Sequence, residues 1–218
     1  ETYPGIVSSV IRKRFYHGYS TYDLSNNYTA KIISELTIDG LSAIVTPDDI
    51  LKYPYAACSQ QSIVFIKVLQ KKGFTTRKVG FKGKKYGGHF CFEVYYNNSW
   101  HFYDPDMEPK TAILTAYKHP DIEFLAEHPD ILVKAYQQYP REKTLDIFTN
   151  YYYGAVNKFP ASNAIVFHKI TKVFSYTLWI IFLFAFIVVR RKYLSICNNN
   201  AQTAKRKFPE IHPELSMR

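Results

Sequence analysis

The chain has 218 residues and a formal net charge of +10, a length that suits one domain with additional segments. Half of the positive excess lies in residues 190–218, which hold seven Lys and Arg against two Glu, so the charge does not form the basic face of a nucleic-acid-binding protein. The three cysteines are too few for a disulfide framework, and their spacing is not typical of a zinc site. We therefore expect no nucleic-acid partner, no metal and no organic cofactor.

The N-terminal stretch, residues 1–45, is predicted to be a mostly helical lead-in to the core. Its apolar positions are separated by polar breaks, and the run from Tyr28 to Leu36 has a helical pattern. The first residue is Glu1 instead of Met, which indicates either a removed signal peptide or a fragment. Thr46, followed directly by Pro47, predicts a helix start or a turn.

A buried helix is predicted to begin near Cys58 and to stop at Gly73. The apolar residues between them suit one helical face: Ile63, Phe65, Ile66 and Leu69. Cys58 falls on the same stripe in the first turn, where unpaired N–H groups and the helix dipole favour a thiolate. Glycine is common just beyond the last helical residue, so Gly73 fits the predicted end.

Residues 88–96 and 99–105 are predicted to form two strands of a hairpin around Asn97-Asn98. If this pair is the loop, Cys91 faces Asp104 across the hairpin. His89 and Asp104 then share one face as diagonal neighbours, about 7–8 Å apart at the backbone. A hydrogen bond between the two side chains is within reach at that distance. A three-residue loop would instead put His89 and Asp104 on opposite faces of the hairpin.

Each residue also has a structural interpretation. Cys58 alone would more often be a small buried apolar residue, and His89 could be a structural histidine of the strand. Asp104 could simply cap the turn before Pro105. We expect the remaining polar residues of the hairpin to be structural: Cys91 as a packing residue, Glu93 as an internal ion-pair or hydrogen-bond partner, and His101 on the opposite face.

Three stretches, residues 55–62, 87–95 and 100–105, resemble the transglutaminase-like superfamily. They place a Cys at a helix start, a Gly-His at a strand start and a Trp ahead of an Asp-Pro, and the resemblance covers roughly residues 46–110. The chain departs from many relatives at Ala57, where they have Gly directly before the Cys. The resemblance implies an α+β fold with a papain-like core, in which the helix that carries the Cys packs on an antiparallel sheet.

The same resemblance implies thiol chemistry on amide bonds of proteins or peptides. Cys58 would be the nucleophile, His89 the base, and Asp104 the group that orients the base. Two alternatives remain open. One is an inactive transglutaminase-like module that binds or scaffolds at a membrane. The other is a papain-like peptidase of a different family with a Gly-His strand and an Asp-Pro, in which the Cys and His lie much farther apart than the 31 residues here.

Residues 111–139 contain helical pieces interrupted by His-Pro pairs, and we interpret residues 140–163 as an aromatic connection that belongs to the same domain. The predicted core with its helical extension is therefore residues 46–163.

A membrane-spanning helix is predicted at residues 173–189, which carry no charge and would form a helix about 25 Å long. Arg190, Arg191 and Lys192 follow directly, so the positive-inside rule predicts a cytoplasmic tail at residues 190–218 and a core on the other side of the membrane. Membrane lipid is then a partner of this segment. The alternative is a buried core helix.

Overall fold

The computed structural model describes residues 2–207 of the chain. The chain divides into two compact units, Glu1–Lys172 and Val173–Arg218. The first unit contains a four-stranded antiparallel sheet with helices on both faces, so the α+β class is confirmed. Residues 208–218 of the predicted tail lie outside the described residues.

The sheet has the strand order β3-β2-β1-β4. Its strands are β1 (Thr75–Lys82), β2 (Gly88–Tyr96), β3 (Ser99–Tyr103) and β4 (Tyr151–Tyr153). Asn97 and Asn98 form the loop between β2 and β3 with φ values of 47° and 60°, as a two-residue type I′ turn requires. The observed register, with Phe92 opposite Tyr103, confirms the predicted hairpin, although β3 ends two residues earlier than expected.

One face of the sheet is covered by α1 (Tyr3–Arg14) and α4 (Cys58–Lys71). Phe65 of α4 packs edge-on against Phe92 of β2 and Tyr103 of β3, with ring centroids 4.6 and 5.7 Å apart. As predicted, α4 stops before Gly73, which has a φ of 84°. The N–H groups of Gly73 and Phe74 donate to carbonyls of the last turn, which closes the helix end.

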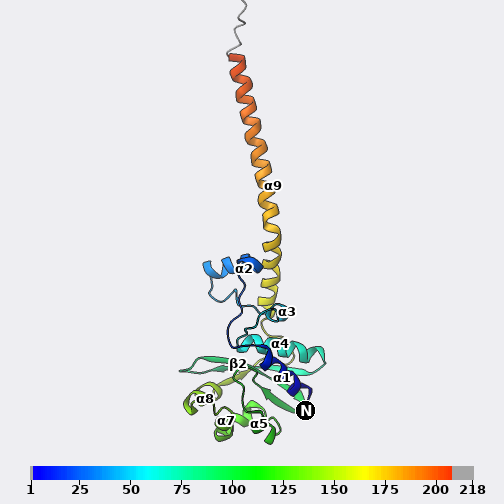
Figure 1. Cartoon of the computed structure of the whole chain (residues 1–218), viewed down its shortest axis with the longest axis vertical. Coiled ribbons are helices and arrows are strands. Elements are labelled where there is room, and N and C mark those ends of the chain that lie inside the picture. Colours follow the sequence, from blue (N-terminus) through cyan, green and yellow to red (C-terminus); the bar gives the residue numbers. More distant parts are fainter. Residues whose placement is uncertain (1, 208–218) are drawn as a thin grey trace, which may run out of the picture. The chain divides into compact units, whose positions relative to one another are not determined.

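Four short helices cover the opposite face of the sheet: α5 (Thr111–Ala116), α6 (Ile122–Glu127), α7 (Pro129–Ala135) and α8 (Arg141–Phe148). Figure 1 shows α5, α7 and α8 on one side of the sheet and α4 on the other. The lead-in also contains α2 (Leu24–Leu36), and α3 (Pro47–Ile50) follows it. The predicted helices at residues 28–36 and near Pro47 are therefore present.

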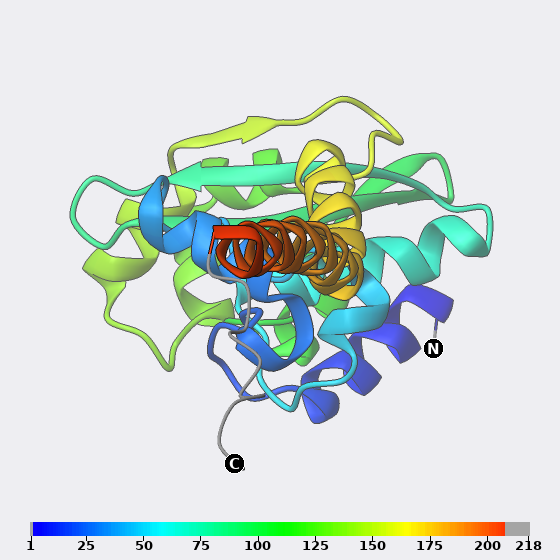
Figure 2. The same cartoon turned by 90° about the horizontal axis from the view of Figure 1, so that it is seen from above.

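The segment 140–163 is more regular than we expected from the sequence. It contains α8 and then β4, which pairs with β1 from Val79 to Phe81 and forms an edge of the sheet (Figure 2). The ring of Tyr152 lies over Gly80, where an added Cβ would meet the ring at 2.3 Å. This strand depends on a partner about seventy residues away in the chain, so no local pattern marks it.

The last helix, α9, runs from Ser162 to Lys207, beyond both ends of the predicted span. Its first turns belong to the first unit, where His168 packs edge-on against Tyr22 and Lys172 contacts Asp49 at 2.9 Å. The part from Ser162 to Asn200 is long and apolar enough to cross a membrane, with a mean hydropathy of 2.2 in its most apolar window. That window is not buried, which argues against a core helix.

Candidate active site

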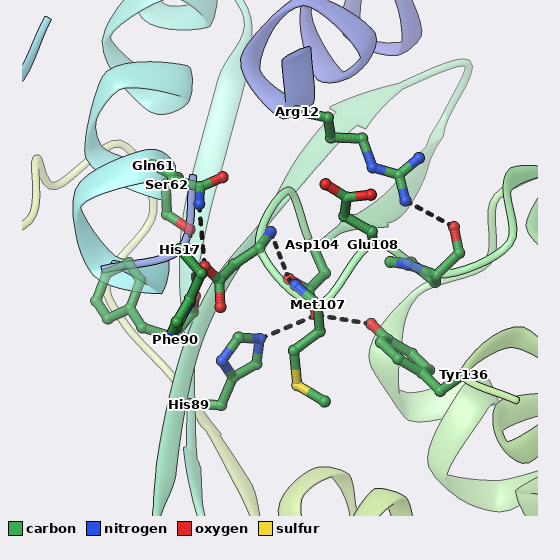
Figure 3. A network of polar contacts seen from close by, with 12 residues as sticks. Arg12, His17, Gln61, Ser62, His89, Phe90, Asp104, Met107, Glu108 and Tyr136 are labelled. Carbon is green, nitrogen blue, oxygen red and sulfur yellow. Dashed lines mark hydrogen bonds and ion pairs between the residues drawn. The ribbon is translucent and has the colours of Figure 1, made fainter. Parts of the chain in front are cut away.

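His89 and Asp104 form a buried pair on the sheet face that carries α5 to α8. Nε2 of His89 lies 2.9 Å from Oδ2 of Asp104, and the two residues are only 8% and 3% exposed (Figure 3). The predicted diagonal pairing across the hairpin is therefore confirmed. This pairing could be predicted from the sequence because the length of the loop determines which residues of the two strands share a face.

Asp104 is held by three further hydrogen bonds. The Tyr136 hydroxyl donates to Oδ2 at 2.9 Å, and the N–H groups of Asp106 and Met107 donate to Oδ1 at 3.1 and 3.0 Å. These three donors hold the Asp104 carboxylate in position independently of its contact with His89. Tyr136, on the turn after α7, was not predicted, because its approach depends on the packing of the small helices.

Each of the two side chains, His89 and Asp104, also shifts the pKa of the other. Burial disfavours a charged imidazole and is the largest single effect, but the charge and hydrogen bond of Asp104, together with Cys91 and Cys58, outweigh it and raise the pKa of His89 well above its ordinary value. Burial also opposes ionisation of Asp104, but His89 and the hydrogen bonds from Met107 and Tyr136 lower the pKa of that carboxyl. The pair therefore favours an imidazolium next to a carboxylate at neutral pH.

Cys58 is the first helical residue of α4, as predicted, and is half-buried. The neighbouring Gln60 fixes the helix start: its Oε1 accepts from the N–H of Ala57 at 3.1 Å, and its Nε2 donates to the Ser20 and Ile44 carbonyls at 2.7 and 2.8 Å. Gln60 thus takes the role of the third helical residue in a capping box, whose side chain reaches back to the N–H of the cap residue. It also ties the helix start to the lead-in segment.

The Cys58 thiol comes close to His89 beside the first residues of β2, where β2 forms an edge of the sheet. The body of α4 packs on the face opposite to His89 and Asp104. Pairing between β2 and β3 begins only at Phe92, so the first residues of β2 have no β3 partner. There Ser62 of α4 donates to the Phe90 carbonyl at 3.2 Å. The sulfur of Cys58 lies within 4.8 Å of a ring nitrogen of His89.

Asp106 is a second carboxylate at the thiol. One of its oxygens lies within 4.8 Å of both the Cys58 sulfur and a His89 ring nitrogen. Its Oδ1 lies 2.7 Å from Nδ1 of His17 and accepts from Nε2 of Gln61 at 3.0 Å. Burial raises the pKa of Asp106. The hairpin parity placed Asp106 opposite His89, but nothing in the sequence linked it to His17 or Gln61.

The other polar residues of the hairpin have structural contacts. Cys91 is fully buried, and burial raises the pKa of its thiol well above the usual value. Glu93 forms the predicted internal ion pair, 2.6 Å from Nε of Arg77, and also accepts from the N–H of Ile122 at 2.7 Å. His101 lies on the opposite face, stacks on Tyr96 and lies 2.6 Å from the His119 carbonyl.

Searches against protein-family models, curated proteins and solved structures find no match to this chain. Its chemistry is therefore argued from the geometry of Cys58, His89 and Asp104.

Proposed function

We propose that the chain is a membrane-anchored thiol enzyme of the transglutaminase-like type, which acts on amide bonds of proteins or peptides. The observation that carries this proposal is the placement of three groups by three elements. The Cys58 thiol at the start of α4 lies within 4.8 Å of the His89 imidazole, whose Nε2 is bound to the buried Asp104 carboxylate. Nucleophile, base and orienting group in contact are the arrangement that activates a thiol.

The proton positions follow from these contacts. Asp104 accepts the Nε2–H of His89, which leaves Nδ1 for the thiol. The proton of Cys58 then resides on Nδ1, which gives the imidazolium that the raised pKa of His89 favours, and the thiolate attacks the carbonyl carbon of the amide. The N–H of Cys58 is one of the first four of the helix, which have no acceptor within the helix, so it can donate to the developing oxyanion.

Collapse of the tetrahedral intermediate breaks the C–N bond. The Nδ1–H of His89 protonates the leaving amine, and an acyl group remains on the Cys58 sulfur. Either water or a second amine then attacks this thioester, giving a proton to His89 as the thiolate leaves. Water makes the enzyme a peptidase or amidase, and an amine makes it a cross-linking acyltransferase.

An exposed aromatic rim next to the thiol supports a peptide substrate. Tyr55, three residues before Cys58, is 53% exposed and lies in ring contact with Tyr16, which is 72% exposed. The backbones of these two segments are joined by hydrogen bonds between residues 16 and 54–56, which hold the rim beside the start of α4. Exposed Tyr side chains are suited to contact apolar groups of a substrate while keeping their hydroxyls in water.

The membrane part of the proposal rests on α9. Residues 173–189 would cross the bilayer, and Arg190, Arg191 and Lys192 would face the cytoplasm, with the thiol site on the other side. Protease added to the cytoplasmic side of sealed vesicles should then cut the tail and spare the core. Cleavage of the core from that side would refute the orientation.

The function itself is tested with the full chain in detergent and a peptide library, with and without a small primary amine. We expect cleaved peptides or amine adducts, detected by mass spectrometry, that disappear in Cys58→Ser. The matched control is Cys197→Ser, because Cys197 is exposed and belongs to the second unit. Turnover that survives in Cys58→Ser, or the absence of turnover and of any acyl adduct on Cys58, would refute the proposal.

A further inference from the structure

The thiol site combines three types of side chain that bind transition metals. A sulfur from Cys58, a ring nitrogen from His89 and a carboxylate oxygen from Asp106 all lie within 4.8 Å of one another. They come from the start of α4, from β2 and from the loop after β3. The three ligands are thus brought together only by the fold, which is why the spacing of Cys and His in the sequence gave no sign of a metal site.

Two of the three ligands, His89 and Asp106, are also oriented by neighbours. The bond from Nε2 of His89 to Asp104 fixes the ring and leaves Nδ1 as the nitrogen for a metal, as the carboxylate partner of a metal-bound histidine does. Among the described residues, both hydrogen bonds to the Asp106 carboxylate fall on Oδ1, from His17 and Gln61. Oδ2 of Asp106 therefore remains for a metal.

We propose that this site binds one zinc ion through Cys58 Sγ, His89 Nδ1 and Asp106 Oδ2, with water as the fourth ligand, and that zinc blocks the thiol reversibly. The blocking role rests on the proposed function, whereas the binding does not. A zinc-bound sulfur has its lone pair in the Zn–S bond and its nucleophilicity is reduced. Nδ1 of His89, once bound to zinc, no longer carries a proton between thiol and substrate.

The ligand set selects the metal. Thiolate and imidazole suit zinc, whereas calcium and magnesium take oxygen ligands. Zinc bonds of about 2.0–2.3 Å place tetrahedral ligand atoms roughly 3.5 Å apart, so small side-chain rotations bring atoms that lie within 4.8 Å into range. A thiolate and a carboxylate together balance the charge of Zn²⁺, which makes the site neutral. Thiol and imidazole ligands bind a metal in their deprotonated forms, so binding weakens as the pH falls.

The binding is tested by titrating the full chain in detergent with zinc chloride in competition with a chromogenic chelator. We expect one ion per chain and a loss of affinity of at least about 100-fold in Cys58→Ser and in Asp106→Asn. The matched controls, Cys197→Ser and Asp121→Asn, should bind like the wild type. Asp121 caps α6 through Phe124, and Asn caps equally well. Unchanged affinity in Cys58→Ser, or no binding in the wild type, would overturn the proposal.

Cobalt(II) gives a second readout that does not depend on activity. If Cys58 is a ligand, cobalt should produce a thiolate charge-transfer band in the wild type and in Cys197→Ser but not in Cys58→Ser. A band that persists in Cys58→Ser would assign the metal to another thiol and overturn the site.

The blocking role is tested by alkylating Cys58 with iodoacetamide with and without saturating zinc. Zinc should protect Cys58 in the wild type, and a chelator should restore its reactivity. Zinc binding without any protection would overturn the blocking role.

Two outcomes separate the metal site from the function. Selective alkylation of Cys58 with no zinc binding refutes the metal site alone. Zinc binding to a chain whose Cys58 is never selectively alkylated refutes the thiol enzyme, and the blocking role with it, but leaves the metal site.

Discussion

His89 and Asp104 are separated by fifteen positions in the chain, and Nε2 of the histidine lies 2.9 Å from Oδ2 of the aspartate. The contact results from the two-residue loop at Asn97 and Asn98, which sets the register of β2 and β3 and puts both side chains on one face. His89 and Asp104 are therefore positioned by a local turn, and the Cys58 thiol is brought to them by the packing of α4 against the sheet.

Asp104→Asn is expected to leave the hairpin in place and to lower turnover by about 10⁴-fold, because the amide can no longer hold the Nε2–H tautomer of His89. The amide keeps an oxygen for the Asp106 and Met107 N–H groups, which favours retention of the local fold. Turnover is measured with the best peptide from the library, and circular dichroism checks the fold. The matched control is Asp121→Asn. A folded Asp104→Asn variant with wild-type turnover would remove Asp104 from the mechanism.

The His89–Asp104 pair predicts how stability depends on pH. The pKa of His89 is raised in the folded chain, so above the unfolded value of about 6.5 the folded state holds a proton that the unfolded state has lost. The contribution of this proton to the free energy of unfolding is complete below about pH 6.5 and falls by up to about 1.4 kcal/mol per pH unit above it.

This dependence is checked by chemical unfolding of the wild type and of His89→Gln between about pH 6.5 and 8.5. The destabilisation caused by the substitution should be largest at the acid end and shrink as the pH rises. A difference that grows with pH would mean that His89 is neutral in the folded chain.

The ion pair between Arg77 and Glu93 should contribute to stability, because Glu93 is fully buried and Arg77 is its charged partner at 2.6 Å. Arg77→Met leaves this carboxylate without its counter-charge and should cost about 3–5 kcal/mol in the free energy of unfolding. Lys85→Met is the matched control, because Lys85 pairs with Glu142 in an exposed position, and it should cost less than about 1 kcal/mol. Equal losses in the two variants would refute the buried-pair account.

A truncation after Lys172 should be soluble without detergent and keep the reactivity of Cys58. A shorter chain ending at Ala161 should be less stable, because it removes His168, which packs against Tyr22, and Lys172, which binds Asp49. Thermal melts of the two chains measure the difference. If the chain ending at Lys172 aggregates in the absence of detergent while the full chain is soluble without it, the apolar helix is part of the core.

The hairpin and α4 could be predicted because their signals are local: an Asn-Asn loop with positive φ values, and apolar residues at helical spacing up to Gly73. The pairing of β4 with β1, the approach of Tyr136 to Asp104 and the contact of His17 with Asp106 join segments between 32 and 89 residues apart. No local pattern encodes such contacts. The helix α9 begins eleven residues before the predicted span, and its contacts there, such as that of Lys172 with Asp49, again join segments far apart in the chain.

The most direct test of the central claim is the rate at which iodoacetamide modifies each cysteine of the folded full chain at neutral pH, read by mass spectrometry. The account predicts that Cys58 reacts at least about 10-fold faster than the buried Cys91 and the exposed Cys197, and that His89→Gln removes this advantage over Cys197. If Cys58 and Cys197 react at the same rate in the wild type, or if His89→Gln leaves the advantage intact, then Cys58 is not activated by His89 and the thiol-enzyme account is contradicted.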